Sequence, residues 1–197
     1  MLARTVKDGV SAYTQINLER LTTAKTASAL CAVGSDQIVV SGGFENNIVY
    51  NKVFRLRLTP LPQTASWEEL PALNVARRDH ASCALGSSVF VFCGTAGDCR
   101  MSLNSIERLS LQREQRMTYW QLIRAPVATL EPRCQPAVAP LNAHEIAILG
   151  GWSKEGFSRL GDVVIFDSRT CKVTKVVASA NEGTPKFNAT ANQSGRT

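Results

Sequence analysis

The stretch that decides the fold is VFVFCG at residues 89–94, an unbroken apolar run that ends on a glycine. The same pattern occurs twice more, as IVVSGG at 38–43 and as IAILGG at 146–151, where the run ends on a glycine pair. The final glycines of successive copies lie 51 and 57 positions apart. A strand-like run that recurs about every 50 residues is typical of a repeat architecture. The chain is therefore expected to consist of similar units placed side by side.

Each run lies inside a longer unit. A basic residue precedes the run by about ten to thirteen positions, and the copies are Lys25, Arg77 with Arg78, and Arg133. Between the basic residue and the apolar run lies a segment of small and apolar residues, at 27–33, 81–85 and 136–139. Two alternating runs follow, first at 49–58, 105–111 and 162–167, then at 67–70, 120–123 and 173–177. Each unit therefore predicts four short β-strands separated by turns.

Four strands in about 50 residues correspond to one blade of a β-propeller, and the details resemble the kelch repeat from about residue 12 to residue 178. Glycine can end a buried strand without steric cost, and this structural role is expected for Gly42, Gly43, Gly94, Gly150 and Gly151. Trp67 and Trp120 are expected to pack between blades. The copies depart from the pattern in three ways: Thr95 follows a single glycine, the third copy lacks its Trp, and Lys25 replaces Arg.

The predicted fold class is all-β, with kelch-type four-stranded antiparallel blades in an incomplete ring. We expect blades at 21–75, 76–130 and 131–178. Residues 1–20 would end a preceding blade or supply a closing strand, and 179–197 would form a polar tail. A propeller closes with roughly four to eight blades. Three blades therefore imply that further blades complete the ring, that two chains complete one ring, or that the array stays open.

Composition narrows the functional classes. Of the 197 residues, 44% are hydrophobic and 19% charged, which suits a folded domain. No apolar stretch approaches the ~20 residues of a membrane span, and no secretory signal is evident. We therefore expect a cytoplasmic protein that does not enter a membrane. The net charge of +6 is spread along the chain, so no nucleic-acid binding is predicted.

The residues that carry chemistry form no recognisable motif. The six cysteines and two histidines lack the spacing of a zinc site, and we find no nucleophile elbow, phosphate-binding loop or metalloprotease motif. We therefore expect no metal, no cofactor and no catalysis. The leading hypothesis is a protein-interaction scaffold or a substrate-recruiting adaptor. The alternative is a propeller enzyme or a sugar-binding protein, similar to sialic-acid mutarotases, with a pocket on the rim.

Binding by a propeller is expected at its loops. The inserts after the glycines and the basic residues that lead into each blade would gather on one rim, and kelch domains commonly bind proteins there. The resemblance implies these partner-binding candidates: Lys25, Arg78, Arg100, Arg133, Trp152, Phe157 and Arg159. Arg and Trp dominate many interfaces. The alternative is that Arg77, Arg78 and Arg133 pair with acids or cap strand ends inside the fold, and for Arg78 and Arg133 the two interpretations are equally open.

Overall fold

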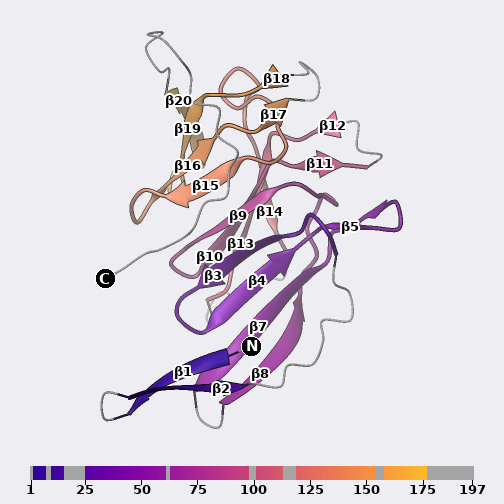
Figure 1. Cartoon of the computed structure of the whole chain (residues 1–197). Helices are drawn as coiled ribbons and strands as arrows, with labels where there is room; N and C mark the ends of the chain where they lie inside the picture. Colours follow the sequence, from indigo (N-terminus) through magenta and orange to yellow (C-terminus); the bar gives the residue numbers. More distant parts are fainter. Residues whose placement is uncertain are drawn as a thin grey trace.

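The chain folds into a row of β-sheets whose ring is not closed (Figure 1). The computed structural model describes residues 2–7, 10–15, 25–60, 63–97, 101–112, 119–153 and 158–176, and within these ranges it contains no helix. The all-β prediction is therefore confirmed.

Three four-stranded antiparallel sheets form the body of the molecule, and we name them blades 1, 2 and 3. Blade 1 contains β3 (Ala29–Val33), β4 (Gln37–Ser41), β7 (Val53–Pro60) and β8 (Gln63–Leu70) in that spatial order. Blade 2 contains β9 (Ala81–Leu85), β10 (Ser88–Phe92), β13 (Ser105–Ser110) and β14 (Gln121–Arg124). Blade 3 contains β15 (Ala137–Pro140), β16 (Glu145–Leu149), β19 (Val163–Asp167) and β20 (Lys172–Val176).

The inserts after the glycines form short antiparallel hairpins, whereas the sequence predicted loops. The pairs are β5 (Phe44–Glu45) with β6 (Ile48–Val49), β11 (Thr95–Ala96) with β12 (Met101–Ser102), and β17 (Trp152–Ser153) with β18 (Ser158–Arg159). The run expected at 49–58 therefore divides, because Val49 belongs to the hairpin and the blade strand begins at Val53. Each insert thus presents its side chains on a defined backbone.

The N-terminal segment forms a β-hairpin. The alternating run near residue 12 is β2 (Val10–Gln15), which pairs antiparallel with β1 (Leu2–Lys7) over its whole length. In the described part of the chain these two strands form a separate two-stranded sheet, not part of a four-stranded one. The tail expected at 179–197 lies outside the described residues.

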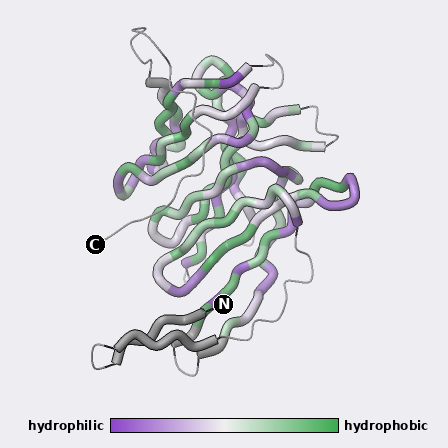
Figure 2. Tube along the Cα trace, in the orientation of Figure 1, coloured by the Kyte–Doolittle hydropathy of each residue, from purple (hydrophilic) through white to green (hydrophobic). Residues whose placement is uncertain are grey.

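The core lies between the blades, and β10 shows why its sequence is apolar at every position. Val89 and Val91 point into the cluster shared with blade 1, and Phe90 and Phe92 point into the cluster shared with blade 3. Alternate side chains of a strand face opposite sides of the sheet, so a strand covered on both sides needs an unbroken apolar run. The hydropathy colours agree, with hydrophobic segments along the strands and hydrophilic ones at the turns (Figure 2).

The glycines that end the middle strands hold neighbouring blades close together. Gly94 has a φ of 97°, and its N–H donates to the Arg133 carbonyl at the entry to blade 3 (2.9 Å). A Cβ at this position would lie 2.8 Å from the Arg78 carbonyl oxygen. The preceding position in blade 2 does not require glycine. Cys93 occupies it with a φ of 58°, a left-handed conformation that L-residues adopt at moderate cost. This difference explains why the second copy keeps only its second glycine.

Candidate interaction surface

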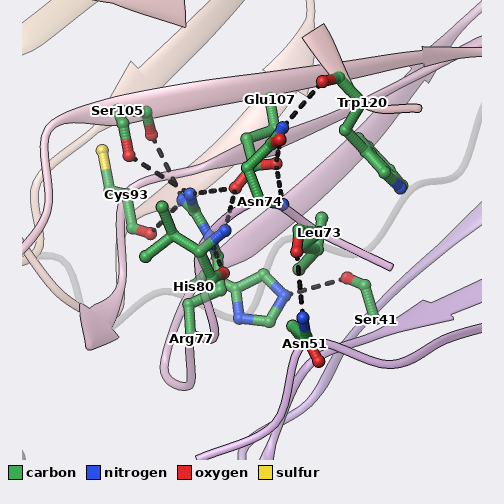
Figure 3. Close-up of polar contacts among 11 residues, drawn as sticks. Ser41, Asn51, Leu73, Asn74, Arg77, His80, Cys93, Ser105, Glu107 and Trp120 are labelled. Carbon is green, nitrogen blue, oxygen red and sulfur yellow. Dashed lines mark hydrogen bonds and ion pairs between the residues drawn. The ribbon is translucent and has the colours of Figure 1, made fainter. Parts of the chain in front are cut away.

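Arg77, one of the basic residues ahead of the blades, is fully buried, and Figure 3 shows its polar contacts. Its Nη2 lies 2.6 Å from Oε1 of Glu107, which is fully buried as well. Its Nη1 donates to the Cys93 carbonyl (2.8 Å), and its Nη2 also donates to the Ser105 hydroxyl (3.1 Å). Burial lowers the pKa of the Arg77 guanidinium, and Glu107 opposes that shift. The residue is a structural element of blade 2, because its charge is compensated inside the fold.

Glu107 joins the segment that leads into blade 2 to the strands of that blade. Its carboxylate accepts hydrogen bonds from the Asn74 backbone N–H (2.7 Å), the Asn74 side chain (2.9 Å) and the Val75 N–H (3.1 Å). The Asn74 amide also donates to the Trp120 carbonyl (2.7 Å), and the Trp120 indole donates to the Pro71 carbonyl (2.8 Å). Trp120 packs in the cluster between blades 1 and 2, and Trp67 is half-buried on β8.

Arg133 repeats this arrangement in blade 3, although it was a candidate for partner binding. Its guanidinium is fully buried. It donates to the Gly150 carbonyl (3.0 Å) and makes two bonds to the Asp162 carboxylate (2.7 and 2.9 Å). A side chain enclosed in this way cannot contact a partner unless the blade rearranges. The structure therefore places Arg133 inside the fold.

Lys25 occupies the equivalent place in blade 1. The residues that follow Lys25, Arg77 and Arg133 each form a bridge with a hairpin of their own blade: Thr26 with Phe44, Arg78 with Thr95, and Cys134 with Trp152. The Lys25 ammonium lies 2.9 Å from Glu45 and 3.5 Å from the centre of the Tyr50 ring. Its side chain is nearly buried, so Lys25 is also engaged within its own blade.

Arg78 differs from its neighbour Arg77 because part of it reaches the surface. Its guanidinium stacks 4.6 Å from the centre of the Phe44 ring, across the boundary between blades 1 and 2, and Nη1 lies 3.5 Å from Asp79. Trp152 and Arg159 are directly opposite each other in the β17–β18 hairpin and are both exposed. Arg100 and Phe157 lie outside the described residues.

In the described part of each hairpin, one large hydrophobic side chain is exposed. Ile48 in β6 is 54% exposed, Met101 in β12 is 65% exposed, and Trp152 in β17 is 37% exposed. The hairpins follow equivalent strands, so they project from the same edge of successive blades (Figure 1). We name the surface formed by Ile48, Arg78, Met101, Trp152 and Arg159 the hairpin rim. Sequence reasoning missed Ile48 and Met101, because only the repeated hairpin shows that these two side chains project.

A shallow polar pocket lies at the opposite edge, between blades 2 and 3. It has a volume of about 270 Å³ and is lined by Leu85, Ser88, Phe90, Arg108, Ala143, His144, Ser168 and Arg169. The Arg108 guanidinium donates to the Ser88 hydroxyl (3.3 Å), and its Nε is buried without a hydrogen-bond partner. The pocket therefore offers a cationic donor at the edge away from the hairpins.

The groups with the most strongly shifted pKa values lie in the interior. The His80 ring pairs with the Ser41 hydroxyl of blade 1 (2.9 Å). Burial, with a smaller contribution from the charge of Arg77, lowers the pKa of His80 to about 3. Burial raises the pKa of Cys83 and that of Cys93 to about 12. All three groups are buried, and their shifts follow chiefly from that burial.

The described residues contain neither a metal-binding cluster nor a membrane-spanning helix. These residues contain no group of three or more His, Cys, Asp or Glu side chains placed to hold a metal ion. The described part of the chain has no helix that is both long and apolar enough to cross a membrane.

Comparison with known proteins supports the fold more strongly than any particular function. No family model matches the chain. The chain is 27% identical over 126 residues to the Rho GTPase-activating protein gacHH of Dictyostelium discoideum, and the match covers 61% of this chain but 8% of that protein. It superposes on the solved structure of YjhT, a β-propeller, with a TM-score of 0.63 at 12% identity, covering 83% of this chain and 54% of that one. The chain therefore spans about half of the solved propeller and less than a tenth of the curated relative.

Proposed function

We propose that this chain is a kelch-type propeller segment that binds other proteins through the hairpin rim and has no catalytic activity of its own. The observation that carries the proposal is the repeated exposure of a large hydrophobic side chain, one on each of three equivalent hairpins. Ile48, Met101 and Trp152 are accompanied by the partly exposed guanidinium of Arg78 and by the exposed Arg159. This composition, apolar and aromatic with arginine, is typical of the centres of protein interfaces.

The geometry of the rim suits a partner that contacts more than one blade. Each hairpin is bridged to the segment that leads into its own blade, and the Arg78 guanidinium stacks on Phe44 of the neighbouring blade. The hairpins are thus tied to rigid sheets, which lowers the conformational entropy lost on binding. The two arginines favour a partner surface with carboxylates around an apolar centre. Such a surface is consistent with an adaptor or scaffold in the cytoplasm.

A quantitative capture experiment tests this proposal. The wild-type chain carrying a crosslinker is compared with a Met101→Ala, Trp152→Ala, Arg159→Ala variant, and bound proteins are quantified by mass spectrometry. We expect the main partners to be depleted at least tenfold in the variant. Leu141→Ala is the matched control, because Leu141 is equally exposed but lies in the β15–β16 turn, away from the hairpins. Equal recovery of every partner by wild type and triple variant would exclude the rim.

The polar pocket favours a second candidate, binding of an acidic sugar or a similar small anion. The Arg108 guanidinium lines this pocket beside the Ser88 hydroxyl, and a guanidinium is a strong donor to a ligand carboxylate. Thermal unfolding with and without sialic acid separates the two candidates. A ligand-dependent rise in Tm that is lost in Arg108→Gln would favour a sugar-binding propeller, and an unchanged Tm at millimolar sugar would exclude it.

A further inference from the structure

The two contacts between neighbouring blades follow one backbone pattern. The glycine that ends the middle strand of one blade donates its N–H to the carbonyl of the basic residue that enters the next. This bond joins Gly43 to Arg77 between blades 1 and 2 and joins Gly94 to Arg133 between blades 2 and 3, at 2.9 Å in both cases. The equal distances show that the connection is a property of the repeat.

A second hydrogen bond repeats beside the first. The N–H of Asp79 donates to the Ala27 carbonyl (3.0 Å), and the N–H of Gln135 donates to the Asp79 carbonyl (2.6 Å). All three residues adopt left-handed conformations, with φ values of 56°, 54° and 52° for Ala27, Asp79 and Gln135. The left-handed residue therefore lies at the same place in each of the three blades, where its N–H and carbonyl can form hydrogen bonds with the neighbouring blades.

The two ends of the array carry the unused halves of this pattern. On blade 3, no hydrogen bond within the described residues engages the Gly151 N–H or the Gln135 carbonyl. On blade 1, the equivalent groups are the Lys25 carbonyl and the Ala27 N–H. The Lys25 carbonyl accepts from the Ser28 hydroxyl (3.2 Å) and keeps a second lone pair, and no described residue accepts from the Ala27 N–H. The donor and acceptor on blade 3 thus match the acceptor and donor on blade 1.

The outer faces of the end blades are apolar as well. On blade 1, Leu30, Val40 and Phe54 form a cross-strand row on the face away from blade 2, and Leu30 is 68% exposed. On blade 3, Leu149 and Val163 form the corresponding row and are partly exposed. In the middle of the array such rows are covered by the next blade. Exposed apolar faces and unpaired backbone groups favour association with a matching surface.

We propose that the occupant of these faces is a second copy of this chain, arranged head to tail, so that two chains close one ring about a twofold axis. In this ring the Gly151 N–H donates to the carbonyl of Lys25 of the partner subunit. The Gln135 carbonyl accepts from the N–H of Ala27 of the partner subunit. The same two bonds form at the second contact, as twofold symmetry requires. A ring of two chains would also have about the size of a known propeller, because one chain covers 54% of the YjhT propeller. The proposal is independent of the hairpin rim.

Size-exclusion chromatography with light scattering tests the pairing. We expect a species of twice the 21.4 kDa chain mass at micromolar concentration, and we expect Leu30→Glu to convert it to a monomer. Leu30 is largely exposed within one chain, so this variant should keep the circular dichroism and cooperative unfolding of a folded protein. Leu141→Glu, a change of the same type in an exposed turn, should remain a dimer.

Mixing two cysteine variants tests the geometry independently. Ala27→Cys and Gln135→Cys, each purified alone and then combined under mild oxidation, should form a disulfide-linked pair, and neither should do so by itself. Within one chain these positions are separated by the corresponding residue of blade 2, Asp79. A monomer at all concentrations up to about 100 µM, a polymer that grows with concentration, or a dimer that Leu30→Glu leaves intact would each overturn the proposal.

Discussion

The buried pair of Arg77 and Glu107 provides the sharpest test of how the blades are stabilised. Arg77→Met keeps most of the side-chain volume but removes the cation that lies 2.6 Å from a fully buried carboxylate. Removing one member of a buried ion pair costs about 3–5 kcal/mol, because the other charge stays in the interior. Three donors from Asn74 and Val75 still reach Glu107, which favours the lower part of that range. The Cys93 carbonyl and the Ser105 hydroxyl also lose a donor, which favours the upper part.

Urea unfolding monitored by tryptophan fluorescence measures this cost. Trp120 is buried in the same network, since its carbonyl accepts from Asn74, so its emission reports on the region that is changed. With an m-value of about 2 kcal/mol/M, the expected loss lowers the midpoint by roughly 1.5–2.5 M. Arg124→Met, at an exposed end of β14, is the control and should stay within about 0.5 kcal/mol of wild type.

A double variant separates the charge from the packing. In Arg77→Met with Glu107→Gln no unpaired charge is buried, so the double variant should be more stable than the sum of the two single changes predicts. If Arg77→Met cost less than about 1 kcal/mol, or if the two changes were additive, the assignment of Arg77 as a structural residue would be refuted.

Two further outcomes are expected. Gly94→Ala should lower the free energy of unfolding in urea by at least about 2 kcal/mol, because the new Cβ meets the Arg78 carbonyl at 2.8 Å and the φ of 97° is strained for alanine. Gly97→Ala is the control and should cost about 1 kcal/mol, because nothing lies within 4 Å of that position. Equal costs for the two variants would contradict the close-approach argument. The pKa of His80 is lowered to about 3 from an ordinary 6.5, so as the pH falls below 6.5 the unfolded chain gains a proton that the folded chain does not. The free energy of unfolding should therefore decrease by up to about 1.4 kcal/mol per pH unit toward pH 3. His80→Gln should flatten this slope relative to wild type, and identical slopes would count against a neutral buried His80.

The architecture could be predicted because it depends on features that repeat. The apolar run of β10 marks a strand covered on both sides, and glycine at residues 43, 94 and 151 marks the place where the end of the strand approaches the segment that leads into its own blade. Both features are local in sequence and recur with the blade period. The four-stranded antiparallel sheets confirm the fold class that these repeated features predicted.

The sequence left the role of the arginines open, because the acid that pairs with each one is distant along the chain. Arg77 pairs with Glu107, 30 positions away in β13, and Arg133 pairs with Asp162, 29 positions away and just before β19. The first copy breaks the pattern, since Lys25 pairs with Glu45 only 20 positions away. The hairpins escaped prediction for another reason, since strands of two residues are too short to show any periodicity.

The alternating faces of β10 also determine how the molecule loses its structure. Blade 2 is the blade whose middle strand is packed on both sides by described neighbours, so within one chain its amide protons should exchange with solvent more slowly than those of β4 or β16. In an array of units held by nearest-neighbour contacts, local opening begins at the ends and moves inward. The two end blades would reach comparable protection only when their outer faces are covered. Amide exchange rates along β4, β10 and β16 therefore record whether the array is open or closed.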